Sequence, residues 1–88
     1  MKYVIGKDFV TNEHVAQVFP AHEYHQETFE RLLHEYPELR FSGAAHCDYD
    51  AETDKWNVHG ESIGYQTKAN VRDQAVLNDL WKNDKLLT

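Results

Sequence analysis

Four stretches of the chain carry the hydrophobic and polar pattern that is typical of β-strands. Residues 2–5 are β-branched and aromatic, and this strand is predicted to resume at residues 9–10. Residues 14–19 form the returning strand of a hairpin. Hydrophobic residues then alternate with polar ones over residues 39–49 and 55–62, which predicts a second antiparallel hairpin with one apolar face on each strand.

Two other stretches place apolar residues at the helical spacing of about 100° per residue. The first helix is predicted to begin at Pro20, because proline suits the first position of a helix. It should end near residue 36, since the next residue is also a proline. The second helix covers residues 71–81, and Asn70 with Asp73 resembles a helix-capping pair at its start.

These elements predict a single domain over residues 1–88 with an α+β fold. We expect a mainly antiparallel (mixed) sheet of four to five strands and two amphipathic helices. The tail at residues 86–87 is either a short edge strand or a frayed end. An 88-residue chain is long enough for one hydrophobic core.

The charge of the chain limits its partners. The formal net charge is −6 and the nine Lys and Arg residues are scattered, which argues against nucleic acid or an anionic membrane surface as a partner. No apolar run approaches the length of a membrane span. The single cysteine, Cys47, excludes an internal disulfide, so we expect a cytoplasmic protein.

His25 is the most informative candidate for chemistry. It falls on the apolar side of the first predicted helix, within the first turn. A histidine in this position is often a core residue with one hydrogen bond. The start of a helix, however, offers free N–H groups and a partial positive charge, which bind anions and keep an imidazole neutral. A neutral imidazole beside an anion site can act as a nucleophile or general base in phosphoryl transfer.

Other chemistry-bearing residues give weaker signals. Six histidines invite a metal hypothesis, but none of the familiar zinc spacings is present. His46 and Cys47 are neighbours on a predicted strand and should point to opposite faces. Ser62 lacks the glycine-flanked turn of a hydrolase nucleophile. We therefore expect no metal and no cofactor.

Three segments together resemble the phosphohistidine phosphatases of the Janus/Ocnus family. They are Glu23-Tyr24-His25 at the predicted helix start, Lys2-Tyr3-Val4 on the first strand, and residues 58–65 (VHGESIGY) near the second helix. The similarity runs in order over nearly the whole chain. The resemblance implies a mixed sheet flanked by two helices, no metal, and hydrolysis of phosphoramidate bonds such as those of phosphohistidine and phospholysine.

The same resemblance implies roles for individual residues. His25 would be the catalytic histidine, and the backbone amides of His25 and Gln26 would hold the phosphoryl group. Where the family tends to place arginines, this chain has Gln17 and His46. The implied phosphate-binding residues are Lys2, Gln26, His46, Ser62 and Gly64, and Gln17 and Tyr65 are further candidates.

Two functions follow from these expectations. The first is a metal-independent phosphatase acting on a phosphorylated protein or a small phosphoramidate. The alternative is a non-catalytic module that binds a phosphate-bearing ligand or a protein through the same concavity, or forms a homodimer through an exposed sheet edge. The missing arginines favour the alternative, and a neutral His25 favours the enzyme.

Overall fold

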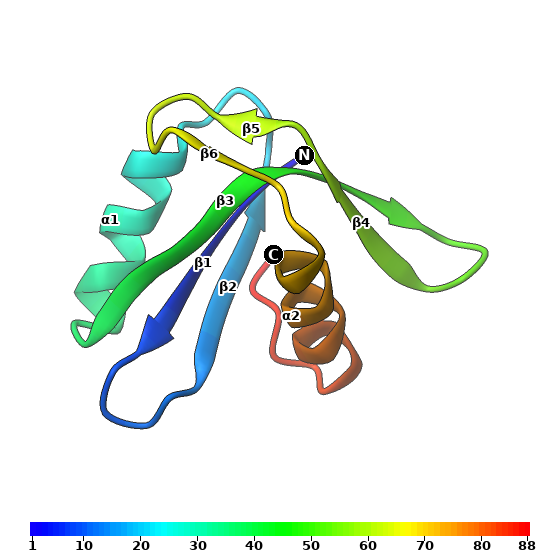
Figure 1. Cartoon of the computed structure of the whole chain (residues 1–88). Coiled ribbons are helices and arrows are strands. Elements are labelled where there is room, and N and C mark those ends of the chain that lie inside the picture. The colour runs from blue at the N-terminus through cyan, green and yellow to red at the C-terminus, as the bar shows by residue number, and fades with distance from the viewer.

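The computed structural model describes all residues from 1 to 88. The chain forms, in order, β1 (Lys2–Asp8), β2 (His14–Phe19), α1 (His25–Glu35), β3 (Leu39–Asp50), β4 (Lys55–His59), β5 (Glu61–Ser62), β6 (Thr67–Lys68) and α2 (Val71–Lys82) (Figure 1). The first four strands make one antiparallel sheet in the order β2-β1-β3-β4, and β5 and β6 make a separate hairpin. The predicted α+β fold is confirmed.

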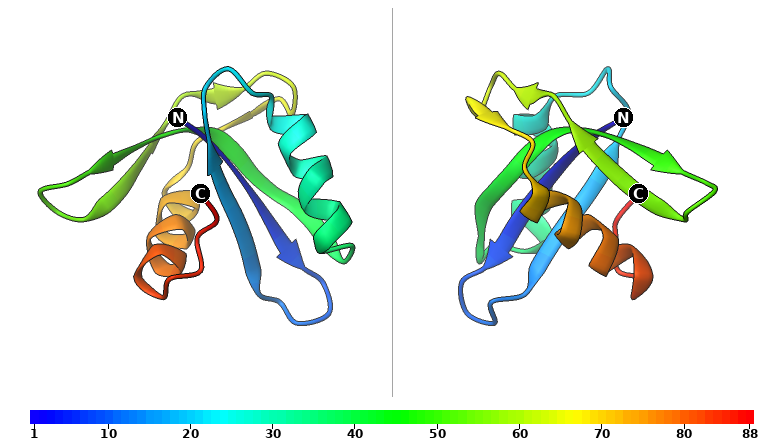
Figure 2. Two further views of the ribbon diagram at one scale, coloured as in Figure 1. Left: turned by 180° about the vertical axis from the view of Figure 1, so that it is seen from behind. Right: turned by 45° about the vertical axis from the view of Figure 1, so that its right-hand side comes forward.

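The two helices cover opposite faces of the four-stranded sheet, as the two views in Figure 2 show. Adjacent residues of β1 point to opposite faces, so Val4 packs on the α1 side and Ile5 on the α2 side. The chain therefore has two small cores separated by the sheet. The buried core on the α1 side contains Val4, Phe19, Phe29, Leu32, Leu39 and Ala44. The core on the α2 side contains Tyr3, Ile5, Ala16, Val18, Ala45, Cys47, Trp56, Leu77 and Leu80.

A β-bulge in β3 changes the face of the sheet to which the side chains of this strand point. Ile5 pairs with Gly43 and Gly6 pairs with Phe41, so the intervening Ser42 has no partner on β1. Before the bulge, Leu39 packs on the α1 side. The prediction of a single apolar face along this strand was therefore wrong, because the extra residue reverses the alternation.

The first helix begins five residues later than predicted. Residues 20–24 form a turn, closed by a hydrogen bond from the Glu23 N–H to the Pro20 carbonyl, and Tyr24 is extended. The Lys2 ammonium donates to the Glu23 carbonyl at 2.8 Å. This long-range contact holds the turn and leaves His25 as the first helical residue.

Two predicted strands also have different limits. The strand β1 runs unbroken to Asp8 and does not resume at residues 9–10, because the Asp8 carboxylate accepts hydrogen bonds from the next turn. The predicted strand over residues 55–62 breaks at Gly60, whose φ of 72° ends the pairing with β3. Beyond this break, Ser62 pairs with Thr67 in the β5–β6 hairpin.

The second helix matches its prediction closely. The Asn70 side chain accepts a hydrogen bond from the Asp73 N–H at 3.0 Å, as expected for a capping residue. Neither helix is long and apolar enough to cross a membrane. After α2, the chain returns to the sheet and Leu87 forms an isolated parallel bridge with Gln17. The tail is thus a short edge contact, one of the two predicted outcomes.

The outer strands β4 and β2 have hydrogen-bond partners on their outer edges. On β4, the Asn78 side chain accepts from the Trp56 N–H and donates to its carbonyl. The Gln74 side chain accepts from the Val58 N–H. On β2, the backbone of Leu87 bonds to the Ala16 carbonyl and the Val18 N–H. The expected open edge is therefore largely occupied.

Candidate functional site

A cleft with a volume of about 540 Å³ lies at the start of α1. We call it the His25 cleft. It is bordered by the first turn of α1, the beginning of β1, the middle of β3 and the β5–β6 turn. Five of the six predicted catalytic and phosphate-binding residues line it: Lys2, His25, Gln26, His46 and Gly64. The remaining lining residues are Tyr24, Glu27, Glu61 and Ile63.

The strand register and the helix position bring these residues together. Lys2 at the start of β1 pairs with His46 on β3, so the two side chains come from neighbouring strands. The Gln26 side chain donates to the Gly64 carbonyl at 3.2 Å, which ties the β5–β6 turn to the start of α1. The cleft is therefore built from segments far apart in the sequence.

The His25 ring is almost buried but borders the cleft. The residue is 8% exposed, and its Nε2 lies 2.8 Å from the Ala45 carbonyl oxygen. A carbonyl can only accept a hydrogen bond, so Nε2 carries the proton. The other ring nitrogen, Nδ1, has no hydrogen-bond partner within the protein. In the neutral ring, Nδ1 thus keeps a free lone pair.

The surroundings favour the neutral form of this imidazole. Burial lowers the pKa of His25 below its usual value, and the nearby Lys2 and His46 lower it further. The hydrogen bond to Ala45 opposes this shift but does not reverse it. Burial and the adjacent His59 also lower the pKa of His46. The sequence predicted a neutral His25 from the helix dipole, whereas burial is the largest cause in the structure.

The lowered pKa of His25 predicts that acid weakens the fold. The unfolded chain binds a proton at this position near pH 6.5 while the folded chain resists it, so the stability is complete above about pH 6.5 and falls at lower pH. We expect the urea midpoint to fall between pH 7 and pH 5, and to fall less in His25→Gln. His34→Ala, on the exposed side of α1, should retain the wild-type slope. An equal slope in His25→Gln would contradict this assignment.

Several groups in the cleft can contact an anion. No side chain caps α1, and no hydrogen bond within the protein engages the backbone N–H groups of His25, Gln26 and Glu27. The half-buried Lys2 adds a positive charge. Glu27 and Glu61 oppose this charge, so the cleft favours one anionic group held at the helix start over a polyanion.

Three predicted residues lie outside the His25 cleft. Ser62 is buried, and its hydroxyl accepts a hydrogen bond from the Tyr65 N–H, because the break at Gly60 turns this residue into the β5–β6 hairpin. The Tyr65 ring stacks on Phe41, with 4.0 Å between the ring centroids. Gln17 borders a different hollow beside α1. None of these three side chains lines the His25 cleft, so the structure does not support a phosphate-binding role for them.

Four lining residues were not among the predicted site residues. Tyr24 was expected on the apolar side of a longer helix, but it precedes the helix and is exposed. Glu61 and Ile63 belong to the segment 58–65 that resembles the Janus/Ocnus phosphatases. Nothing in the sequence indicated that their side chains would line a binding site. Glu27 was expected on the solvent side of α1 and does lie there, at the border of the cleft.

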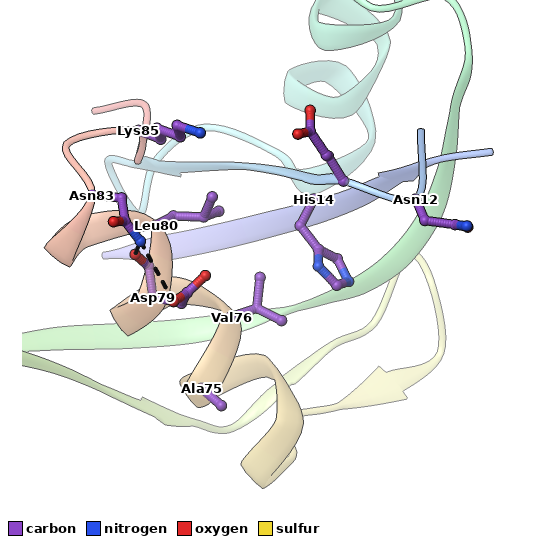
Figure 3. A pocket seen from close by; sticks show the side chains of 9 residues that line it. Asn12, His14, Ala75, Val76, Asp79, Leu80, Asn83 and Lys85 are labelled. Atoms are coloured by element: carbon purple, nitrogen blue, oxygen red, sulfur yellow. Dashed lines mark hydrogen bonds between the residues drawn. The ribbon is translucent and has the colours of Figure 1, made fainter. Parts of the chain in front are cut away.

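A second hollow, of about 440 Å³, lies between the start of β2 and the side of α2 that carries Val76 and Leu80 (Figure 3). In Figure 3, His14 and Val76 border it from the strand and the helix respectively. Two carboxylates, Glu13 and Asp79, face one ammonium group, that of Lys85. This charge balance does not favour an anion, and the hollow holds none of the predicted site residues.

The structure contains no group of three or more His, Cys, Asp and Glu side chains that could hold a metal ion. Cys47 is buried in the core on the α2 side, and burial raises the pKa of its thiol to about 11. His46, its neighbour on β3, points to the His25 cleft instead. The two side chains thus lie on opposite faces, as the strand pattern predicted.

No protein-family model, curated protein or solved structure matches this chain.

Proposed function

We propose that the protein is a small, metal-independent phosphatase that hydrolyses the N–P bond of phosphohistidine or a related phosphoramidate. The main support is a single observation: a neutral, nearly buried His25, whose Nδ1 atom has no hydrogen-bond partner within the protein, lines a cleft with unpaired helix amides. The resemblance of the three sequence segments to the Janus/Ocnus phosphatases agrees with this assignment.

The cleft can supply each part of the reaction. His25 Nδ1 either attacks phosphorus or takes a proton from a water molecule that attacks it. The P–N bond then breaks, and the leaving nitrogen takes a proton. If His25 is the nucleophile, water next cleaves the P–N bond to His25 and releases phosphate. The amides of His25 and Gln26, together with Lys2, hold the phosphoryl oxygens. A nitrogen leaving group is readily protonated, so the reaction does not require a metal.

The alternative function is phosphate-ligand or protein binding without turnover at the same cleft. One observation favours it: Glu27 and Glu61 line the cleft and no arginine does. Arginine holds phosphate through two parallel hydrogen bonds, which neither lysine nor histidine reproduces.

The buried, reduced Cys47 is in keeping with a reducing compartment such as the cytoplasm for either function.

Lys2→Gln should lower kcat/KM for phosphoramidate by roughly 10- to 150-fold, because a charge-assisted hydrogen bond contributes roughly 1.5–3 kcal/mol. Release of inorganic phosphate can be followed by phosphorus NMR. Lys7→Gln is the matched control, since Lys7 lies on the same strand, is exposed and does not line the cleft. Equal losses in the two variants would mean that Lys2 does not hold the phosphoryl group.

The same assay separates the two functions. Turnover by the wild type in the presence of a chelator supports the metal-independent phosphatase. Binding of phosphoramidate or inorganic phosphate without turnover favours the binding module. Turnover that the chelator abolishes would show that catalysis uses a metal ion.

A further inference from the structure

Two large hydrophobic side chains border the His25 cleft and remain exposed to water. Tyr24 is 66% exposed and Ile63 is 83% exposed. Tyr24 lies just before α1, and Ile63 lies in the β5–β6 turn, so they come from the two segments that border the helix start. Exposed apolar area at the mouth of a ligand cleft is typical of a recognition surface.

Contacts within the protein hold the Tyr24 ring and the backbone turn that carries Ile63. The Lys2 ammonium lies 5.6 Å from the centre of the Tyr24 ring. The turn that carries Ile63 is closed by a hydrogen bond from the Gln66 N–H to the Ile63 carbonyl. The bond between Gln26 and Gly64 fixes the same turn to α1. The backbone segments that present the two side chains are thus fixed relative to the helix start, which reduces the entropy lost on binding.

We propose that Tyr24 and Ile63 select polypeptide substrates in which a large apolar side chain neighbours the phosphorylated nitrogen-bearing residue. This inference rests on the proposed phosphatase function. The phosphoryl group would occupy the helix start beside His25. The neighbouring side chain would cover the exposed surface of Tyr24 and Ile63.

The size and charge of the cleft argue for a polypeptide over a small polyphosphate. A volume of about 540 Å³ falls in the range of sites that bind ligands much larger than a phosphoryl group. Glu27 and Glu61 repel further anionic groups, so nucleotides and other polyanions are disfavoured. A polypeptide segment brings one phosphoryl group and a largely uncharged remainder.

The test uses two histidine-phosphorylated peptides that differ only in the residue next to phosphohistidine, leucine in one and serine in the other. Wild-type protein should show a kcat/KM about tenfold higher for the leucine peptide, from partial burial of one aliphatic side chain. Tyr24→Ser and Ile63→Ser should each reduce this ratio, and the double variant should bring it close to one. Val71→Ser is the control, because Val71 is 79% exposed but does not line the cleft, and it should keep the wild-type ratio.

Small phosphoramidate, assayed beside the peptides, separates this inference from the proposed function. A wild type that hydrolyses phosphoramidate and both peptides at equal rates would overturn the inference alone. A wild type that hydrolyses none of them would overturn the phosphatase function, and the selectivity with it. A ratio that survives in the double variant would assign the selectivity to other residues.

Discussion

Replacement of His25 by alanine should lower kcat/KM for phosphoramidate by about 10³-fold, because the variant loses the group that attacks phosphorus or activates water in the proposed reaction. No other imidazole in the cleft lies at the start of α1. His46 is a second imidazole, but it comes from β3, and its ring lies edge-on to His25 with 6.1 Å between the ring centroids.

The controls must separate chemistry from folding. Alanine at position 25 leaves the Ala45 carbonyl without its side-chain partner, at a cost of roughly 1–3 kcal/mol. His25→Gln keeps an N–H donor for Ala45 but has no basic ring nitrogen, so it should be folded and equally inactive. His34→Ala changes an exposed histidine of the same helix and should retain wild-type turnover. Activity of His25→Gln within tenfold of the wild type would remove His25 from the mechanism.

Gly43→Ala should destabilise the fold by about 3 kcal/mol, the upper end of the usual range for overpacking a core. A β-carbon at this position would lie 2.6 Å from Asp73 Oδ1. Asp73 cannot move away easily, since it is buried and accepts a 2.6 Å hydrogen bond from the Tyr3 hydroxyl. The cost therefore comes from forcing apart β3 and the first turn of α2.

Urea unfolding measures this effect. Gly64→Ala is the matched control, because its added β-carbon would lie 3.4 Å from the Gln26 side chain and should change the stability little. The Asp73→Ala variant keeps the cap bond to the Asn70 side chain, since the donor is the backbone N–H of residue 73. Adding Gly43→Ala to Asp73→Ala should then cost much less than in the wild type. Additive losses in this double-mutant cycle would contradict the predicted clash.

Local signals predicted the elements that depend on local contacts. The strand β2 and the helix α2 with its Asn70 cap were found because turn residues and side-chain spacing define them within a few positions. The start of α1 was missed because the Lys2 ammonium, 21 positions earlier in the chain, occupies the Glu23 carbonyl. Such a contact has no signature in the sequence around Pro20.

The site residues, too, were predicted correctly only where a local sequence signal pointed to them. His25 and Lys2 were found because a helix start and a short sequence resemblance pointed to them, and both line the cleft. Ser62 was expected to line the cleft as part of a continuous strand, but the positive φ of Gly60 redirects the chain before it. The bulge at Ser42 had a similar effect on β3, because one unpaired residue reverses every later side chain.

Side chains of α2 and the backbone of Leu87 bond to the outer edges of β4 and β2. These bonds restrict how the protein can recognise a polypeptide. With the Trp56 and Val58 amides bonded to α2 and the middle of β2 bonded to Leu87, an incoming segment finds few backbone groups with which to continue the sheet. Recognition by β-augmentation is therefore disfavoured at β2 and β4. A partner that adds a strand at β4 or β2 would first have to displace part of α2 or the C-terminal residues.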